Sequence, residues 1–293
     1  MDVTEIKQAC ESHYGLSDTP FSLTPDTGFY VGLESHDEAF EAVQYALAGG
    51  EGFIKVTGEV GTGKTLLCRR LLNHLESVNS DTAYIPNPTL SPTALWLAIG
   101  DELGLSGHSR LSQLRADIQR YLLNIAQEGR RLVLVIDEAQ CLPAETLEAL
   151  RLISNLETER QKLVQIVLFG QPELDDILSE QRFRQLRQRI TTSAHIEALR
   201  TPESVSHYLN HRLVCAGYRG EPLFTRGAVR FLWISSGGTP RLVNVLAAKS
   251  LLVAFGQGSK AIHAQHVEKA AADTESIQQP IAWHERLKLV IGL

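Results

Sequence analysis

The sequence contains a glycine-rich segment whose spacing matches a phosphate-binding loop. It reads Gly58-Glu59-Val60-Gly61-Thr62-Gly63-Lys64-Thr65, between the apolar run 53–56 and a helical pattern that begins at Leu66. Glycines at these places let backbone N–H groups converge on a phosphate, and the following helix N-terminus adds free donors. We expect Lys64 to reach the β- and γ-phosphates of a nucleoside triphosphate and the Thr65 hydroxyl to bind Mg²⁺. A loop that only turns the chain needs neither side chain. The predicted nucleotide contacts of this segment run from Gly58 to Leu66.

Two acidic residues follow a second apolar run. Leu132–Ile136 leads directly into Asp137 and Glu138. Ligands of open α/β sheets bind at the carboxyl ends of the strands, where this pair would lie. Asp137 suits the holding of Mg²⁺ through water, and Glu138 suits the polarising of a water for attack on the γ-phosphate. An acidic pair alone is common at helix starts, but the loop upstream favours the catalytic interpretation. The second carboxylate favours hydrolysis over transfer to an acceptor hydroxyl.

Further polar residues lie where they could meet a γ-phosphate. Gln171 follows the apolar run 163–169, and Arg241 follows Gly238-Thr239-Pro240 at a predicted helix start. Arg187 and Arg189 belong to a cluster with Arg182 and Arg184 just before the run 190–196. In a ring of subunits, such a cluster can supply an arginine to the nucleotide of the neighbour. The alternatives are a polar turn for Gln171, a solvated helix end for the cluster and a surface position for Arg241.

Short apolar runs alternate with helical patterns from residue 33 to residue 198. Runs that are apolar at nearly every position fit strands covered on both faces, and their alternation with helices implies a parallel sheet with right-handed crossovers. We therefore predict an α/β domain over 33–198 with a five-stranded parallel sheet. The expected strands are 53–56, 82–85, 132–136, 163–169 and 190–196, and helical periodicity covers 65–75, 111–126 and 144–157.

The remainder of the chain carries only helical periodicity. Thr201-Pro202 and Thr239-Pro240 match helix starts, with threonine as the cap and proline at the first helical position. Gly217, the pair 237–238 and the segment 256–258 suit helix ends in the left-handed conformation. We predict a small all-helical domain over 199–275, preceded by an N-terminal segment, 1–32, and followed by a C-terminal tail, 276–293. The expected helices are 204–216, 225–235, 240–255 and 263–272.

The bulk composition restricts the function classes. The chain has 293 residues, with 28 Lys and Arg against 34 Asp and Glu and a formal net charge of −6. This negative net charge argues against a protein that binds nucleic acid or anionic membranes through its overall charge. Four scattered cysteines form no metal-ligand or disulfide pattern, and they indicate reduced thiols. We see neither a signal peptide nor an apolar run of membrane-spanning length.

The combined motifs resemble those of AAA+ ATPases, P-loop NTPases in which a helical lid follows an α/β core. The resemblance rests on the loop 58–65, the acidic segment 136–140, the segment 168–174 and the segment 238–241. More narrowly, Tyr14-Gly15-Leu16 and Pro20-Phe21-Ser22-Leu23-Thr24-Pro25-Asp26 are similar to the start of ExeA-type ATPases, the general secretion pathway protein A group, which includes ATPases of MSHA pilus biogenesis. The resemblance covers residues 12 to 275.

By this resemblance, the candidate residues acquire specific roles. Lys64 and Thr65 would be Walker A, and Asp137 and Glu138 would be Walker B. Gln171 would be sensor 1. The resemblance also implies that Arg241 is sensor 2, that Arg187 or Arg189 is the arginine finger, and that Phe21, in the segment 1–32, lies near the adenine. Packing of that segment on the sheet is the alternative for Phe21.

The same resemblance implies the wider function. We expect an ATP- and Mg²⁺-dependent ATPase that forms a homo-oligomeric ring, with six subunits as one option. It would act as a cytoplasmic motor or switch in type IV (MSHA-type) pilus or type II secretion machinery, peripheral to the inner membrane through a protein partner. ExeA-type proteins continue into a transmembrane helix and a periplasmic domain, which this sequence does not include. Two alternatives are a DNA-associated regulator resembling the transposition ATPases TnsC and TniB, and an ATP-binding scaffold with negligible turnover.

Overall fold

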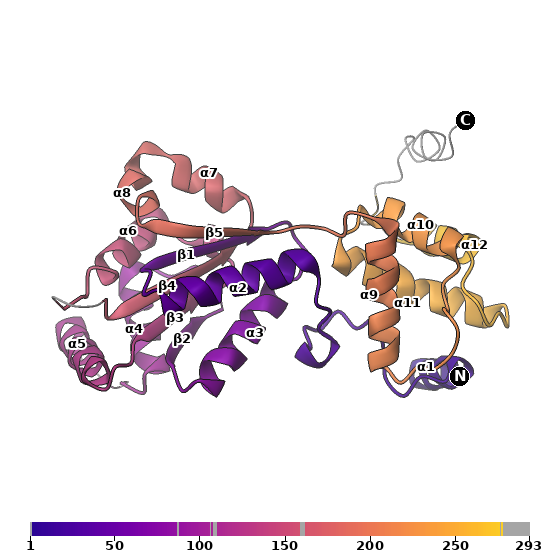
Figure 1. Ribbon diagram of the computed structural model, residues 1–293, viewed down its shortest axis with the longest axis horizontal. Helices are drawn as coiled ribbons and strands as arrows, with labels where there is room; N and C mark the ends of the chain where they lie inside the picture. The colour runs from indigo at the N-terminus through magenta and orange to yellow at the C-terminus, as the bar shows by residue number, and fades with distance from the viewer. Residues whose placement is uncertain are drawn as a thin grey trace. The chain divides into compact units, whose positions relative to one another are not determined.

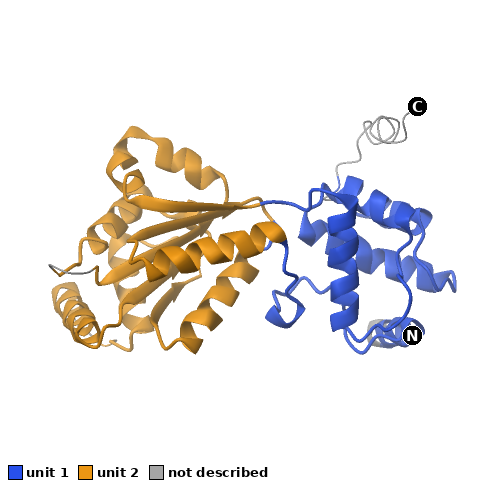
Figure 2. Ribbon diagram, in the orientation of Figure 1, with its two compact units in different colours: residues 1–33, 61–63, 197–293 blue, residues 34–60, 64–196 orange. Residues whose placement is uncertain are grey.

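The computed structural model describes residues 2–86, 88–105, 107, 110–158, 162–275 and 277. The chain divides into two compact units, which Figure 2 colours separately. The α/β unit comprises residues 34–60 and 64–196, and the helical unit comprises residues 1–33, 61–63 and 197–293. The predicted C-terminal tail, 276–293, lies outside the described residues except for Ile277, which packs against the core of the helical unit.

The α/β unit is built on a five-stranded sheet (Figure 1). All paired strands are parallel, in the order β2-β3-β4-β1-β5. The predicted five-stranded parallel sheet is therefore confirmed, and each predicted strand limit lies within two residues of the observed one. The strands are β1 (Phe53–Gly58), β2 (Asp81–Ile85), β3 (Leu132–Ile136), β4 (Val164–Gly170) and β5 (Ile190–Ile196).

Helices connect these strands. The predicted helix over 144–157 ends earlier, at Ile153, because the chain turns there and Glu157 forms an isolated antiparallel bridge with Lys162. The helices of this unit are α2 (Glu34–Ala48), α3 (Lys64–Ser77), α4 (Pro92–Glu102), α5 (Leu111–Gln127), α6 (Ala144–Ile153), α7 (Glu173–Ser179) and α8 (Arg184–Arg187), with short 3-10 turns η2 (Ala139–Cys141) and η3 (Gln181–Phe183).

Each face of the sheet has its own hydrophobic core. Alternate residues of β3 divide between the faces, so that Leu134 packs with residues of α4, α5 and α6, whereas Val133 and Val135 pack with residues of α2 and α3. All five residues of β3 are buried. Strands covered on both faces read as continuous apolar runs, which is why the sequence revealed them.

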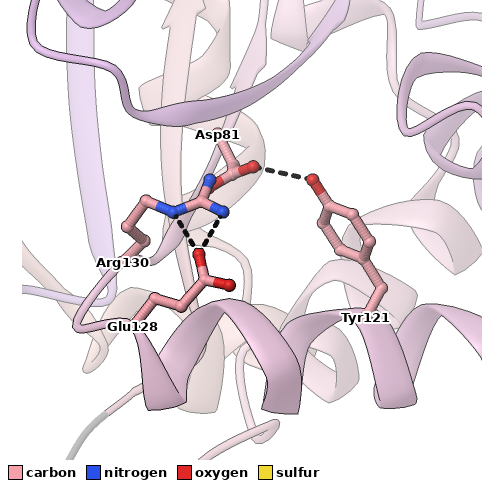
Figure 3. Close-up of polar contacts among 4 residues, drawn as sticks. All are labelled: Asp81, Tyr121, Glu128 and Arg130. Atoms are coloured by element: carbon pink, nitrogen blue, oxygen red, sulfur yellow. Dashed lines mark hydrogen bonds and ion pairs between the residues drawn. The ribbon is translucent and has the colours of Figure 1, made fainter.

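Polar contacts at the edge where the strands begin tie α5 to the sheet (Figure 3). Asp81, the first residue of β2, accepts a hydrogen bond from the Tyr121 hydroxyl at 2.6 Å and pairs with Arg130. The Arg130 guanidinium also donates to one Glu128 carboxylate oxygen, at 3.0 Å from Nε and 2.6 Å from Nη2. These contacts hold the turn after α5 beside the start of β2.

Among the described residues after 197, the helical unit contains the four helices that the sequence predicts: α9 (Pro202–Cys215), α10 (Arg226–Ser236), α11 (Pro240–Gly256) and α12 (Ala264–Ala272). Thr201 caps α9, since its side chain accepts from the backbone N–H of Ser204. Thr239 occupies the predicted cap position and Pro240 begins α11, but the Thr239 side chain makes no capping hydrogen bond. No helix in the described part of the chain has the length and apolar composition needed to span a bilayer.

A tight turn joins α10 to α11. Gly238 has a φ of +73°, in the left-handed region, and its backbone carbonyl accepts from the N–H of Leu199 at 2.9 Å. A Cβ at this position would lie 2.1 Å from the Leu199 carbonyl oxygen. Only glycine therefore fits this turn without displacement of the backbone.

The N-terminal segment packs within the helical unit. It forms α1 (Val3–Tyr14) and the 3-10 turn η1 (Thr27–Phe29), and it contributes Phe21 to the buried core of this unit. The buried Arg212 side chain of α9 donates through Nε to the carbonyl of Pro20 at 2.6 Å. The segment is thus held by a buried polar contact as well as by apolar packing.

Candidate functional site

The predicted site residues of the α/β unit follow three neighbouring strands. β1 ends in the glycine-rich loop, β3 ends immediately before Asp137, and β4 ends immediately before Gln171. Because the sheet order places β4 between β3 and β1, the three carboxyl ends lie together at one sheet edge. Residues more than a hundred positions apart in the sequence thereby converge.

The lysine of the loop is enclosed by the loop itself. Lys64 begins α3 and is only 5% exposed, and its ammonium group donates to the carbonyls of Gly58 and Glu59 at 2.7 and 2.9 Å. Burial lowers the pKa of the Lys64 amine, while the charges of Glu138 and Asp137 act in the opposite direction. The ammonium group is held at the start of a helix, where free N–H groups also favour an anion.

Thr65 and Asp137 form an oxygen pair suited to a hard divalent cation. The Thr65 hydroxyl donates to Asp137 Oδ2 at 3.1 Å, and Asp137 is 3% exposed. Burial raises the pKa of Asp137, against the lowering effect of hydrogen bonds from the Glu138 backbone and Thr65. Mg²⁺ prefers hydroxyl, carboxylate and water oxygens. The residues present therefore fit the predicted ion.

Glu138 is held by two amide side chains. Its backbone has φ 51° and ψ 41°, in the left-handed region that few non-glycine residues adopt. Its carboxylate Oε2 accepts from Gln140 Nε2 at 2.6 Å and from Gln171 Nε2 at 3.1 Å. Burial raises the pKa of Glu138, but these two hydrogen bonds and the charge of Lys64 outweigh it and hold the pKa below its usual value. Glu138 is thus oriented and negatively charged.

Sequence reasoning missed Gln140 as a member of this group. Its Oε1 accepts from the backbone N–H of Gln171 at 3.0 Å, while its Nε2 contacts Glu138. The only signal in the sequence was a polar residue two positions after Glu138. That signal does not reveal a contact with a residue 31 positions further along the chain.

The structure places Arg241 beside the loop glycines within the helical unit. The Arg241 N–H donates to the carbonyl of Gly61 at 3.1 Å. Gly61 has a φ of +81°, and a Cβ there would lie 2.7 Å from the Cβ of Arg241. Glycine is therefore required by both the backbone conformation and the close approach.

The two candidate arginine fingers have different surroundings. Arg187 is exposed and donates to the carbonyl of Ser179 at 2.9 Å. Arg189 is half-buried and donates to the Ser154 hydroxyl at 2.8 Å. The structure brings neither guanidinium into hydrogen-bonding contact with the Lys64, Asp137 and Glu138 group within the described residues of this chain.

Phe21 lies in the core of the helical unit. It is 3% exposed and contacts Phe224 edge to face, with 5.9 Å between ring centroids. The contact with adenine stays a prediction.

Comparison with known proteins gives this site a family context. A family model described as "AAA domain" matches residues 47–178, which contain the loop, Asp137, Glu138 and Gln171. The α/β unit therefore contains a segment that is similar to AAA domains. The chain is also 40% identical over 281 residues to general secretion pathway protein A of Aeromonas hydrophila. The aligned region covers 95% of this chain and 51% of the relative. The predicted resemblance to the ExeA type is thereby confirmed, and the chain spans about half the length of this curated relative.

Solved structures share the fold of this chain at low sequence identity. Cdc6p from Pyrobaculum aerophilum has a TM-score of 0.66 and 17% identity, with 94% of this chain and 74% of that chain covered. ORC2 from Aeropyrum pernix, solved as ADPNP-ADP complexes, has a TM-score of 0.64 and 16% identity, with 89% and 73% covered. The RuvB branch migration motor of Thermotoga maritima has a TM-score of 0.53 and 17% identity, with 83% and 70% covered. These matches confirm the predicted P-loop fold with a helical domain after the core.

Proposed function

We propose that this chain binds ATP with Mg²⁺ and hydrolyses ATP to ADP and phosphate. The observation that carries the proposal is the convergence of Lys64, the Thr65–Asp137 pair and the oriented Glu138 at one sheet edge of the α/β unit. A loop that only turned the chain would not need a lysine ammonium group, two oxygens able to bind Mg²⁺ and a carboxylate oriented by hydrogen bonds in one place.

The residues would divide the chemistry among them. The Lys64 ammonium would exchange its contacts with two loop carbonyls for contacts with the β- and γ-phosphates. Thr65 and Asp137 would hold Mg²⁺, which neutralises phosphate charge. Glu138 would orient the attacking water and accept its proton, and Gln171 would hold Glu138 or contact the γ-phosphate.

Three further residues complete the proposal. The exposed Arg187 suits an arginine finger acting on a neighbouring subunit better than the half-buried Arg189, which contacts Ser154. Arg241, beside Gly61, would report the state of the nucleotide to the helical unit. Phe21 would contribute an apolar contact near the adenine.

The cellular role is inferred from the relative. Similarity to general secretion pathway protein A along 95% of the chain supports a function in secretion-type machinery. We propose an oligomeric, ring-forming motor or switch that contacts protein components of type II secretion or type IV (MSHA-type) pilus assembly. It would work in the cytoplasm and reach the inner membrane through such a partner.

The test is ATP turnover with matched variants. Lys64→Ala should abolish turnover and weaken nucleotide binding, because the phosphates lose their cation. Glu138→Gln should still bind ATP but hydrolyse it at least about a hundredfold more slowly, the usual effect of removing a general base. Lys162→Ala and Glu145→Gln change the same residue types away from the site and should behave as the wild type. Normal hydrolysis by Lys64→Ala would show that the site is assigned wrongly.

The second candidate function is association with DNA. Arg182, Arg184 and Arg187 are exposed on one short segment, and phosphate contacts need only local positive charge. Against it, Arg182 pairs with Glu180, and the net charge is −6. An ATP-dependent gel shift at two salt concentrations decides the matter, since true phosphate contacts weaken as salt rises. Absence of an ATP-dependent shift rejects this candidate.

A further inference from the structure

Gln140 connects the ends of two adjacent strands through a single side chain. It lies in η2, directly after β3 and Glu138. Its amide nitrogen donates to Glu138 Oε2 at 2.6 Å, and its amide oxygen accepts from the backbone N–H of Gln171, after β4, at 3.0 Å. The amide donor of Gln140 therefore contacts Glu138, after β3, and its amide acceptor contacts Gln171, after β4.

The contacts around Gln140 close into a ring. Gln171 donates through its side chain to the same Glu138 oxygen at 3.1 Å, while its backbone N–H donates to Gln140. The two amide donors share Oε2, and within the described residues the other Glu138 oxygen accepts no hydrogen bond. That second oxygen is left for an external donor such as water.

The neighbouring backbone leaves room for this arrangement. Gly170 is the last residue of β4, and a Cβ built on it would lie 3.3 Å from the Gln140 amide oxygen and 2.8 Å from Leu174 Cδ2. A larger residue would press on the amide that holds Glu138. The close packing shows that Gln140 occupies a defined position.

We propose that Gln140 is a positioning residue for ATP hydrolysis, which holds the Glu138 carboxylate by one oxygen and links it to the end of β4. The inference rests on the proposed ATPase function. A glutamate side chain has several rotatable bonds, and restricting it beforehand removes an entropic cost from the reaction step. The link through the Gln171 N–H also means that displacement of the β4 end displaces the Glu138 carboxylate.

The test uses two substitutions in the full-length protein. Gln140→Met keeps the length of the side chain but removes both donor and acceptor, while Gln140→Glu keeps an oxygen for the Gln171 N–H and removes the donor. Gln119→Met, on the exposed side of α5, is the matched control. Turnover, the Kd of a non-hydrolysable ATP analogue, and hydrogen exchange of the Gln171 amide in nucleotide-free protein are measured for each.

We expect kcat to fall about tenfold in both Gln140 variants, the usual effect of losing a hydrogen bond to a charged group. The analogue Kd and the KM for ATP should stay within about twofold of the control, since Gln140 does not contact nucleotide in the proposed arrangement. Exchange at Gln171 should become faster in Gln140→Met and remain slow in Gln140→Glu. In a Glu138→Gln background, Gln140→Met should cause no further loss of turnover.

Several results would overturn the inference. The first is a kcat of Gln140→Met equal to or above that of the control. The second is an unchanged rate of hydrogen exchange at the Gln171 amide in Gln140→Met. The third is a tenfold loss of turnover when Gln140→Met is added to Glu138→Gln. Failure of the proposed function is distinguishable, because it would appear as absence of turnover in the wild type. Analogue binding by Gln140→Glu verifies folding if Gln140→Met is unstable.

Discussion

Replacing Arg212 with methionine should loosen the N-terminal segment from the helical unit. Arg212 is 5% exposed, and its strongest contact is the 2.6 Å hydrogen bond from Nε to the Pro20 carbonyl. Longer contacts, each at 3.4 Å, reach the Ser22 carbonyl and the Tyr208 hydroxyl. The guanidinium carbon also lies 5.2 Å from the centre of the Phe29 ring. No carboxylate pairs with this arginine in the part of the chain that the structure describes.

The expected magnitude follows from these contacts. Loss of a hydrogen bond to a charged group costs about 1.5–3 kcal/mol, and the Pro20 carbonyl would be left buried without its donor. Removal of an unpaired buried charge offsets part of this cost, because its desolvation penalty disappears. We expect a net destabilisation of about 2 kcal/mol. For a unit of this size that corresponds to a decrease in Tm of roughly 8 °C.

Calorimetry of the full chain, together with limited proteolysis, measures the effect. Cleavage within residues 1–33 should become faster at a temperature at which the α/β unit stays intact. Arg219→Met is the matched control, because Arg219 is exposed and its hydrogen bonds to the described carbonyls of Val214 and Tyr218 are both 3.5 Å long. If Arg212→Met melts within about 2 °C of Arg219→Met and is cleaved no faster, the reasoning about the buried contact is wrong.

Two further predictions concern stability and thiol chemistry. Tyr121→Phe removes the donor to Asp81 and should destabilise the chain by about 1 kcal/mol in urea unfolding; an unchanged midpoint would contradict the structural role of that contact. Burial, with a smaller contribution from Glu11, raises the pKa of Cys10 to about 11, and burial raises the pKa of Cys68 further. Raised values leave almost no thiolate at pH 8, so a thiol reagent should label only the two exposed cysteines until the chain unfolds. Rapid labelling of four thiols in the native state would refute this.

The sheet and the phosphate loop were predictable from sequence because their signals are local. A strand buried on both faces, such as β3, appears as an uninterrupted apolar run, and the loop 58–65 needs glycine, lysine and threonine at fixed places. Helix limits were less predictable. The periodicity of α6 continues to Glu157, but Ile153 ends the helix because the following residues lead into a bridge with Lys162.

Buried polar residues were harder to predict, although one of them had a signal. Arg212 occupies the apolar stripe of α9 formed with Val205, Tyr208 and Leu209, at a spacing that places it in the core. An arginine there needs partners, but its partner, the Pro20 carbonyl, is 192 positions away. The Thr239-Pro240 pattern correctly placed the start of α11, but it could not show that the Thr239 side chain makes no capping hydrogen bond.

The arrangement around Glu138 follows from sheet order rather than from any motif. Glu138 adopts a left-handed backbone conformation, which costs a non-glycine residue on the order of 1 kcal/mol. Glycine would relieve that cost but would remove the carboxylate. Hydrogen bonds made possible by the adjacency of β3 and β4 offset this backbone strain. The Gln171 side chain donates to the Glu138 carboxylate, and the Gln171 backbone N–H donates to Gln140. The same acidic pair after a strand without that neighbour would lack both contacts, so the adjacency of β3 and β4 is itself part of the proposed site.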